Sequence, residues 1–533
     1  MHQRRLFIVA SIILAVALIA AGFLIGERWN ARTLPAAGSS ASPKSSGSAS
    51  PNGSPVVSGP GRSLLSALSG PQRKQEVAAM VAGLRLVDYY PSANSWTKMW
   101  TNWNAKVLGS DFARIHALGG NAVRIVVFPY TFGWPTISSL MANRFANTLR
   151  IAADNGLAVQ VTLFDWWGEY NQISQSQAWL KSFLSPYASD PEIQLVELKN
   201  EVDPADSAEV AWVRALLPTL RSVMPRTPST VSVSGTAGPS GFVRLRGELS
   251  GAPLDVADIH FYGDEVTAYS WMLAAKRAAG TLPLFVGEIG VPIMDTNGAG
   301  AEAAAYQQAH WFSVVFAAAR AAGVATPAPW TLYDFKPGTV PSAESDSSAY
   351  NYGLYSDTGR WRPAVEVVQE AFAGRSIDTS NLNFRLLGQN KLPMVWSQDL
   401  SGQGNLSYDP RMTYLGSDSV SISRTEPCFT GSSSFFLVPT DPAISGQLWT
   451  VSAWAKGVRV DGITQVSLSW FNSANSYMGN EASEALAQGD PNWTKLTVSA
   501  HVPRNVTGVV VHLKSCGLTG TVWFANVQIS VTP

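Results

Sequence analysis

Short apolar runs alternate with helix-type patterns from about residue 64 to residue 372. A run such as Ala122–Phe128 is apolar at almost every position, which is typical of a strand buried on both faces of a parallel sheet. The segments between the runs, such as Ala208–Val223, repeat apolar residues at helical spacing. The strand candidates are Leu84–Tyr89, Ala122–Phe128, Ala158–Phe164, Ile193–Leu198, Thr230–Ser234, Val256–Phe261, Leu284–Val286 and Ala325–Thr331. The helix candidates include Asp111–Leu118, Asn143–Asn155, Ala208–Val223, Val266–Ala279 and Ala301–Ala322.

These alternations predict an α/β fold, a (β/α)8 TIM barrel over residues 63–376. An open doubly wound sheet is disfavoured because no Gly-rich phosphate loop follows the first run.

The pattern changes at about Asn383, after which short runs alternate apolar and polar residues between Gly, Asn, Asp and Pro turns. This pattern predicts an antiparallel β-sandwich, jelly-roll-like, over residues 383–533. Its strand candidates are Leu448–Lys456, Gln465–Phe471, Thr494–Val502, Gly508–Leu513 and Thr521–Ile529.

The N-terminal region carries an uncharged apolar run, Leu6–Ile25, after the basic residues Arg4 and Arg5. As a helix, 20 residues span about 30 Å, enough to cross a bilayer. We therefore expect residues 1–27 to be a transmembrane signal-anchor or a signal peptide, with the rest of the chain extracytoplasmic, membrane-anchored or secreted. Residues 28–62 are rich in Ser, Gly and Pro and are predicted to be a flexible linker.

Charge and cysteine content narrow the classes of function. Lys plus Arg and Asp plus Glu both number 38, so the formal charge is zero, and this balance argues against a nucleic-acid partner. The two cysteines, Cys428 and Cys516, are expected to form a disulfide if the chain is exported; two reduced core thiols are the alternative. No residues show metal-ligand spacing, so no metal site is predicted.

Polar and aromatic residues follow most of the predicted strands. Since the carboxyl ends of parallel strands meet at one mouth of a barrel, these side chains should surround one site. They are Arg124 in the second run, Asp165, Trp166 and Trp167 after the third, Asn200 and Glu201 after the fourth, His260 and Tyr262 after the sixth, Glu288 after the seventh, and Trp330 in the eighth.

This ordered set resembles clan A glycoside hydrolases, most closely family 5, which includes cellulases and mannanases. The resemblance implies a retaining glycosidase that cleaves β-glycosidic bonds of a polysaccharide or oligosaccharide, without a cofactor. Glu201 is then the acid/base and Glu288 the nucleophile, with a carboxyl separation of about 5–5.5 Å. Burial and the charge of Glu288 are expected to raise the pKa of Glu201, while Arg124 and Tyr262 keep Glu288 ionised.

The other residues of the set are expected to bind substrate. The resemblance implies that Asn200 bonds the sugar 2-hydroxyl, that His260 lies near the acid/base or the sugar, and that Trp330 forms the floor under the sugar. Many family 5 enzymes have a His after the third strand, whereas this chain has Asp165, Trp166 and Trp167. Trp166 and Trp167 are therefore candidate sugar-binding residues, and the alternative for both, as for Asp165, Trp96 and Trp134, is plain packing.

The C-terminal runs Val451–Lys456 and Thr521–Val527 resemble jelly-roll carbohydrate-binding modules, with Trp470, Tyr477 and Trp493 as candidate stacking residues or core residues. Two alternatives remain for the whole chain. One is a transglycosylase with the same residues, and the other is a non-catalytic carbohydrate-binding protein of the cell surface.

Overall fold

The computed structural model describes residues 63–295, 298–342, 348–424, 432–517 and 519–533. The predicted membrane segment and linker, residues 1–62, lie outside this part of the chain, as does Cys428. The expected disulfide of Cys428 with Cys516 therefore stays a prediction. Among the described helices, none is both long enough and apolar enough to cross a bilayer.

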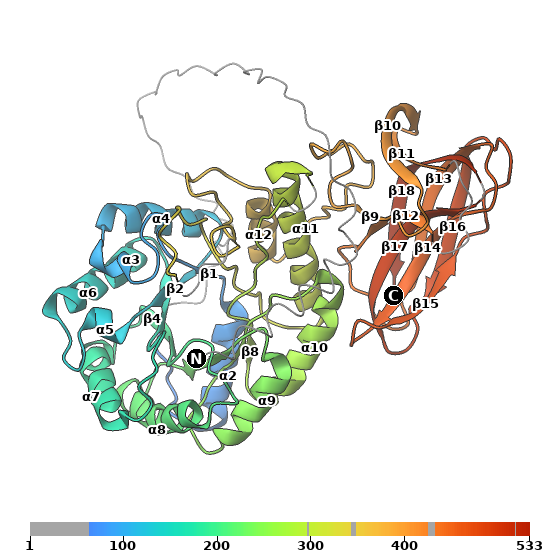
Figure 1. The fold of residues 1–533 in the computed structure, drawn as a ribbon. Helices are drawn as coiled ribbons and strands as arrows, with labels where there is room; N and C mark the ends of the chain where they lie inside the picture. The colour runs from blue at the N-terminus through green and yellow to red at the C-terminus, as the bar shows by residue number, and fades with distance from the viewer. Residues whose placement is uncertain (1–62, 296–297, 343–347, 425–431, 518) are drawn as a thin grey trace, which may run out of the picture. The chain divides into compact units, whose positions relative to one another are not determined.

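The first part of the described chain is built from parallel strands and helices, as the apolar pattern predicts (Figure 1). One parallel sheet runs in the order β1-β2-β3-β4-β5, and a second runs in the order β6-β7-β8. The strands are β1 Leu86–Asp88, β2 Ala122–Val126, β3 Ala158–Thr162, β4 Ile193–Glu197, β5 Ser229–Thr230, β6 Ser232–Val233, β7 Ala257–Ile259 and β8 Leu284–Phe285.

The helices lie around these strands (Figure 1). They are α2 Gly70–Gly83, α3 Lys98–Thr101, α4 Ala105–Ala117, α5 Pro129–Phe132, α6 Ser139–Asp154, α7 Ile173–Leu184, α8 Ser207–Val223, α9 Gly238–Glu248, α10 Ala268–Ala279, α11 Gly300–Ala321 and α12 Ala364–Phe372. The 3-10 turns are η1 Ser185–Tyr187 and η2 Glu265–Thr267.

Two strand candidates differ from the expectation. The fifth is divided into β5 and β6, which belong to different sheets. The eighth, Ala325–Thr331, is not a regular strand and makes only an isolated bridge between Ile289 and Pro329. Pro327 and Pro329 have no N–H to donate, so a continuous ladder cannot form there.

Backbone hydrogen bonds nevertheless connect this irregular segment to strands on both sides. Trp330 donates its N–H to the carbonyl of Ile289 at 2.8 Å, and Asp88 of β1 donates to the carbonyl of Pro329 at 3.1 Å. Residues 328–332 therefore lie between the segment after β8 and β1, which is where the eighth strand of a barrel belongs.

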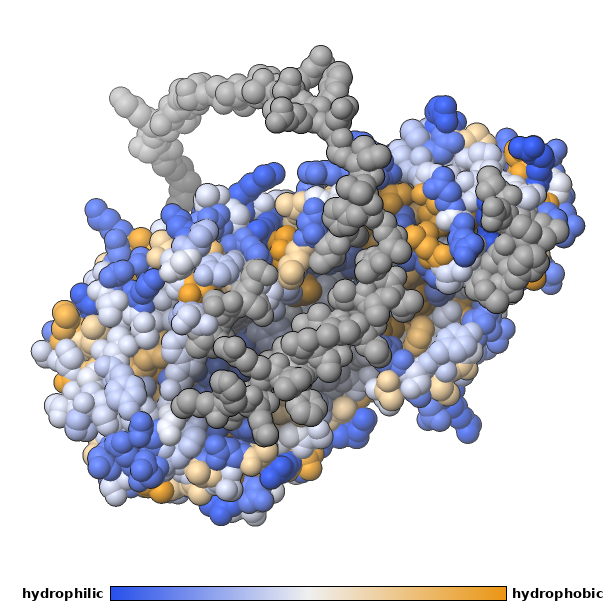
Figure 2. All heavy atoms as spheres, viewed as in Figure 1, coloured by the Kyte–Doolittle hydropathy of each residue, from blue (hydrophilic) through white to orange (hydrophobic). Residues whose placement is uncertain are grey.

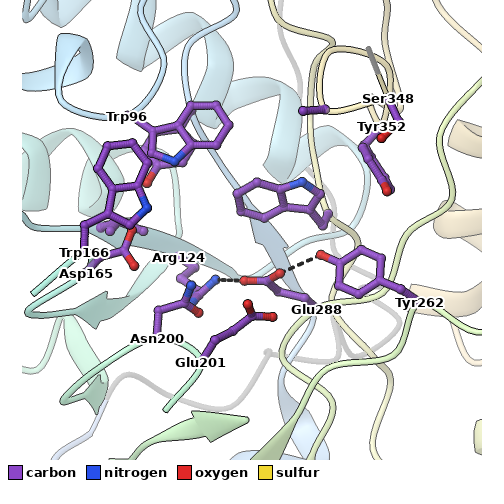
Figure 3. Close-up of a pocket in the computed structure, with 14 residues that line it drawn as sticks. Trp96, Arg124, Asp165, Trp166, Asn200, Glu201, Tyr262, Glu288, Ser348 and Tyr352 are labelled. Carbon is purple, nitrogen blue, oxygen red and sulfur yellow. Dashed lines mark hydrogen bonds and ion pairs between the residues drawn. The ribbon is translucent and has the colours of Figure 1, made fainter. Parts of the chain in front are cut away.

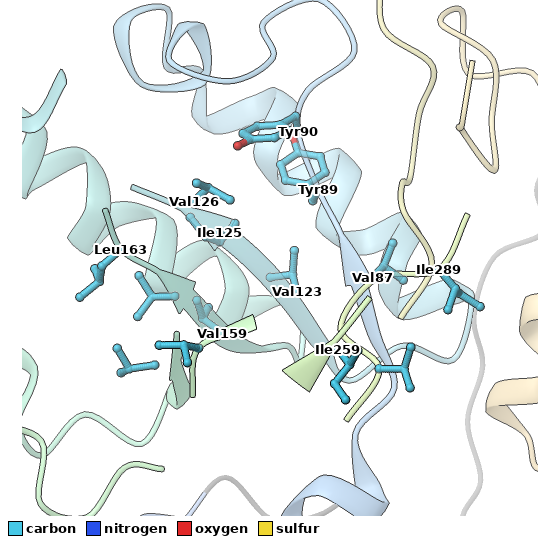
Figure 4. Close-up of a cluster of buried hydrophobic side chains, with 14 of the residues drawn as sticks. Val87, Tyr89, Tyr90, Val123, Ile125, Val126, Val159, Leu163, Ile259 and Ile289 are labelled. Carbon is cyan, nitrogen blue, oxygen red and sulfur yellow. The ribbon is translucent and has the colours of Figure 1, made fainter. Parts of the chain in front are cut away.

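The alternation along the strands separates an apolar face from a polar one. Val87, Val123 and Val159 are register partners on neighbouring strands and belong to the main hydrophobic core (Figure 4). Since successive side chains point to opposite faces, the next register positions, Asp88 and Arg124, share the other face. This face carries the polar side chains from which the site is built.

The C-terminal part is antiparallel, as predicted, and is drawn in orange and red in Figure 1. Two five-stranded sheets have the orders β10-β11-β18-β13-β16 and β15-β14-β17-β12-β9. Val451 of one sheet and Leu468 of the other belong to a single buried cluster, so the two sheets form one core. The strands are β9 Ser397–Asp399, β10 Asn405–Tyr414, β11 Ser417–Arg424, β12 Ser433–Leu437, β13 Leu448–Val458, β14 Ile463–Asn472, β15 Tyr477–Ala482, β16 Thr494–His501, β17 Val506–Cys516 and β18 Gly520–Thr532.

The described surface mixes hydrophilic and hydrophobic residues on the face drawn in Figure 2. Large exposed apolar side chains such as Tyr130, Trp361 and Leu415 are present among them. Scattered apolar residues of this kind are normal for a protein surface and indicate no partner by themselves.

Candidate active site

A pocket of about 270 Å³ lies at the carboxyl ends of the parallel strands (Figure 3). Its walls come from segments that follow β1, β3, β4, β7 and β8 and from the irregular eighth segment. The lining residues are Tyr90, Trp96, Arg124, Val126, Asp165, Trp166, Asn200, Glu201, Tyr262, Glu288, Trp330, Ser348, Ala349 and Tyr352. Eight residues of the predicted set, the two glutamates included, line this pocket, and His260 is bonded to Glu201.

The two glutamates lie close to the same nitrogen of one imidazole. His260 Nδ1 is 2.9 Å from Oε1 of Glu201 and 3.4 Å from Oε2 of Glu288. A carboxylate oxygen of each glutamate and a ring nitrogen of His260 all lie within 4.8 Å of one another. The two carboxyl groups therefore face each other across the floor of the pocket, although 87 positions separate them in sequence.

Glu288 is held on both oxygens. Arg124 Nη1 donates to Oε1, and the Tyr262 hydroxyl donates to Oε2 at 2.6 Å (Figure 3). The side chain of Glu288 is only 7% exposed. Two donors, one of them charged, thus fix the position of both carboxylate oxygens of this buried side chain.

Arg124 connects the pocket to the polar face of the strands. Besides Glu288, its guanidinium donates to Asp88 Oδ1 at 3.0 Å, to Glu197 Oε2 at 2.8 Å and to Asn200 Oδ1 at 2.7 Å. Burial alone would lower the pKa of Arg124, but Glu197, Glu288 and Asp88 raise it well above its ordinary value. The fork of five N–H donors fits this multiple contact, which a lysine could not make.

Glu201 has an unusual backbone and an accessible side chain. Its φ is 47°, in the left-handed region that non-glycine residues rarely adopt. Its N–H donates to Ser232 Oγ at 2.8 Å, which fixes the turn after β4. The side chain is 38% exposed, so one oxygen can bond His260 while the carboxylate still faces the pocket.

The expected direction of the Glu201 pKa was wrong. Burial raises this pKa, but the hydrogen bond and the positive charge of His260 outweigh burial and lower it below the ordinary value. Conversely, burial opposes the charged form of His260, but Glu288 and Glu201 raise the pKa of His260 to about 10. The charges of His260 and Glu201 therefore favour each other.

Aromatic rings form the wall of the pocket on the side of β3. Trp166 is 42% exposed, and its ring lies 6.3 Å from that of Trp96 at an interplanar angle of 19°. Trp96 in turn contacts Trp330 edge-on at 6.2 Å. Flat faces of this kind are suited to stacking against sugar rings.

Trp167 is not part of the pocket, although it follows Trp166 directly. It is 3% exposed, and its ring lies 4.4 Å from Trp134 and 5.6 Å from Phe164. The two adjacent tryptophans point in different directions, and the left-handed φ of 56° at Trp166 turns the chain between them. Trp167 is a core residue, which corrects its assignment as a sugar-binding candidate.

The sequence pattern did not select several residues of the site. Tyr90, Trp96 and Tyr352 line the pocket from outside the ordered set. Asp258 lies two positions before His260, on the same side of a strand, which is a signal that could have marked it. Glu197 lies inside an apolar run, where a buried carboxylate requires a partner.

Two sets of side chains place possible ligand atoms within 4.8 Å of one another, namely Glu197, Asp258 and His260, and Glu201, His260 and Glu288. The guanidinium of Arg124 lies among these carboxylates and already supplies positive charge. We assign no metal to either set.

The three stacking candidates of the β-sandwich lie in different environments. Trp470 is 2% exposed and belongs to the sandwich core. Tyr477 is 58% exposed, with its ring 6.0 Å from that of Phe471. Trp493 stacks on Tyr414 at 4.9 Å. Trp470 is thus excluded as a surface platform, and the other two remain available.

Comparison with known proteins gives similarity only at the level of structure. No protein-family model and no curated protein matches the chain. Among solved structures, the exo-β-1,4-mannosidase Op5Man5 from Opitutaceae bacterium strain TAV5 matches 54% of this chain with 20% identity and a TM-score of 0.45. The match spans 59% of that enzyme's length, which is less than two thirds of it.

Two further solved structures show the same range of similarity. GH5_18 from Streptomyces cattleya, in complex with GlcNAc, matches 54% of this chain and 80% of its own length, with 17% identity and a TM-score of 0.45. A GH2 β-galacturonidase from Eisenbergiella tayi, bound to galacturonate, matches 55% of this chain and 52% of its own length, with 14% identity and a TM-score of 0.43. The likeness to family 5 glycoside hydrolases therefore extends over about half of the chain.

Proposed function

We propose that this chain is a retaining glycoside hydrolase of clan A that cleaves β-glycosidic bonds of a polysaccharide or oligosaccharide on a closed (β/α)8 barrel. The observation that carries the proposal is the pair Glu201 and Glu288, whose carboxylate oxygens lie within 4.8 Å of each other at the floor of an aromatic-walled pocket. Retaining glycosidases have carboxyl groups about 5–5.5 Å apart, whereas inverting enzymes need about 6.5–9.5 Å to admit a water.

In the first step Glu288 attacks the anomeric carbon. Its carboxylate oxygen forms a bond to that carbon as the bond from carbon to the leaving oxygen breaks, and Glu201 delivers a proton to the leaving oxygen. Arg124 and Tyr262 hold the carboxylate of Glu288 in its orientation for this attack.

In the second step water releases the sugar. Glu201, now without the proton, takes a proton from water, and the water oxygen bonds the anomeric carbon as the bond to Glu288 breaks. The anomeric configuration is inverted twice and thus retained.

The other pocket residues position the sugar. Arg124 holds Asn200 through its Oδ1, which leaves the amide N–H groups of Asn200 to donate to a sugar hydroxyl. Trp330 and Trp166 offer ring faces, and Asp165 supplies a carboxylate for further hydroxyl groups at the same side of the pocket.

We also propose that the enzyme acts outside the cytoplasm, anchored by or exported through the apolar run Leu6–Ile25, and that the β-sandwich assists carbohydrate binding. The composition of residues 1–62 and the resemblance of the C-terminal strands to carbohydrate-binding modules support these assignments. A disulfide of Cys428 with Cys516 belongs to the same proposal.

Glu288→Ala tests the catalytic assignment. Against a panel of β-linked polysaccharides, the wild-type protein should release reducing ends, and the variant should lose activity by about 10⁴-fold or more because the nucleophile is gone. Glu366→Ala is a matched control, since Glu366 is exposed on α12 and outside the pocket. Proton NMR of the first-formed product should show the β anomer. Equal rates for wild type and Glu288→Ala would overturn the assignment, and a first-formed α anomer would overturn retention.

A further inference from the structure

The imidazole of His260 lies between two pairs of carboxyl groups. On the Nδ1 side are Glu201 and Glu288, at 2.9 and 3.4 Å. A second pair, Glu197 and Asp258, forms with a ring nitrogen of His260 another set of atoms within 4.8 Å of one another. Asp258 precedes His260 by two positions, and Glu197 ends β4. Neither Glu197 nor Asp258 lines the pocket.

Glu197 and Asp258 are completely buried, and one carboxylate oxygen of each accepts hydrogen bonds. Glu197 Oε2 accepts from Arg124 and from the hydroxyl of Thr162 at 2.6 Å, and Asp258 Oδ1 accepts from the N–H of Gly287 at 2.9 Å. The Ser232 hydroxyl also lowers the pKa of Glu197, whereas Asp258 Oδ2 and His260 Nε2 have no hydrogen-bond partner within the described part of the chain. All three residues are 0% exposed. Unpartnered buried polar atoms are rare in proteins and each requires an explanation.

Only one protonation state of His260 suits both pairs. A neutral imidazole has one N–H and one lone pair, so one of its nitrogens would present a lone pair to carboxylate oxygens. The imidazolium has an N–H on both nitrogens and a positive charge between the two pairs. Its Nε2–H is then a charged donor within the buried cluster that Glu197 and Asp258 form with the ring.

We propose that Glu197 and Asp258 are positioning residues that keep His260 protonated on both nitrogens, so that the proton for the acid step is stored on His260 Nδ1. This inference rests on the proposed glycosidase function. In the acid step the Nδ1–H bond of His260 breaks as an O–H bond forms on Glu201, and that proton moves on to the leaving oxygen of the glycoside. In the second step the proton taken from water returns through Glu201 to Nδ1. Glu201 therefore acts as a relay, and no proton is gained or lost over the cycle.

The electrostatic data agree with this geometry. Despite burial, the surrounding carboxylates raise the pKa of His260 to about 10, while His260 lowers the pKa of Glu201. Burial and the charge of Glu197 raise the pKa of Asp258 to about 7. Asp258 is therefore negative on the alkaline side of neutrality, where its charge is needed to hold the proton on His260.

Charged side chains from several strands lie near His260 and affect its pKa. Glu201 follows β4, Glu288 follows β8 and Asp258 lies on β7, and all three raise the pKa of His260. Glu197 on β4 and Asp88 on β1 also interact with its charge. The positive charge in the same cluster is Arg124 on β2, which is ion-paired with Asp88, Glu197 and Glu288.

The variant Asp258→Asn tests the proposal through the pH dependence of kcat/KM. Removing the negative charge lowers the pKa of His260, so the alkaline limb of the profile should move to lower pH by about 1 unit or more. At about pH 6, where Asp258 already carries its proton for most of the time, kcat should remain within a few-fold of the wild type. A residue with only a structural role would lower the whole profile without moving the limb.

Asp111→Asn is the matched control. Asp111 is also buried, and it accepts hydrogen bonds from the hydroxyls of Tyr89 and Tyr333, which an amide oxygen can still accept. The alkaline limb of the kcat/KM profile of Asp111→Asn should coincide with that of the wild type. The proposal is overturned if the limb of Asp258→Asn also stays in place.

A second measurement needs neither the variant nor activity. In wild-type protein labelled with ¹⁵N-histidine, both ring nitrogens of His260 should have imidazolium shifts at pH 8, with the signals assigned by their loss in His260→Gln. A neutral imidazole at pH 8, or a metal found bound to His260 by elemental mass spectrometry, overturns the inference. A charged His260 in a protein that hydrolyses no glycoside would instead reject the proposed function and leave the charge state established.

Discussion

Arg124 offers a direct test of how the polar cluster is held together. It lies among Asp88, Glu197 and Glu288, whose side chains are 1%, 0% and 7% exposed. Arg124→Gln removes the only guanidinium that contacts these three carboxylates among the described residues. A buried ion pair that loses one partner typically costs about 3–5 kcal/mol, because the remaining charge is buried without compensation.

The cost should depend strongly on pH. Burial raises the pKa of Asp88 well above its ordinary value even beside Arg124, and without Arg124 burial should raise the pKa of Glu197 above its unfolded value as well. A carboxyl group whose pKa is raised in the folded state makes the folded protein less stable as pH rises. Protonating a carboxyl of ordinary pKa 4.5 costs about 4 kcal/mol at pH 7.5 but less than about 1 kcal/mol at pH 5.0. We therefore expect a destabilisation of about 3–5 kcal/mol at pH 7.5 and about 1–2 kcal/mol at pH 5.0.

Urea unfolding followed by circular dichroism at 222 nm measures this difference. All described α-helices lie between Gly70 and Phe372, so the signal reports on the part that contains Arg124. Arg214→Gln is the control, since Arg214 is 49% exposed in a surface pair with Glu248 and should lose less than about 1 kcal/mol. A loss for Arg124→Gln that is below about 1 kcal/mol, or that is the same at both pH values, would refute the reasoning.

Two further substitutions separate chemistry from packing. Tyr262→Phe removes the hydroxyl that donates to Glu288 at 2.6 Å. Because a hydrogen bond to a charged group contributes about 1.5–3 kcal/mol, kcat should fall about 10- to 150-fold with KM nearly unchanged. A kcat within two-fold of the wild-type value would contradict this role. Trp166→Ala should raise KM about 2- to 10-fold with little change in stability, because its ring is exposed in the pocket. Trp167 is buried, so Trp167→Ala should lower the free energy of unfolding by about 3–5 kcal/mol. Kinetics and urea unfolding of both variants would show the opposite result if the two roles were exchanged.

The sequence predicted the elements of the fold better where the apolar pattern is strong. Ala122–Phe128 and Ala158–Phe164 overlap closely with β2 and β3, because a run buried on both faces leaves an unmistakable pattern. Strands β9 to β12 were not predicted, since they are short, irregular or rich in serine, as in Ser417–Arg424. Such segments are strands through pairing with neighbours, which local composition does not encode.

For the site, the sequence alone determined which chemistry-bearing residues stand at strand ends. Glu201, Glu288, Arg124 and Tyr262 were identified because polar residues directly after apolar runs are conspicuous, and their convergence follows from parallel strands. Which polar residues follow an apolar run can be read from neighbouring positions in the sequence, without knowledge of packing.

Only the tertiary structure decided how these residues are charged and which neighbours they have. The pKa of Glu201 is lowered rather than raised because the hydrogen bond and the charge of His260, 59 positions away in sequence, outweigh burial. Trp167 differs from Trp166 only by the direction in which the chain turns. Electrostatic energies depend on distance and burial in space, and neither quantity is contained in the order of residues along the chain.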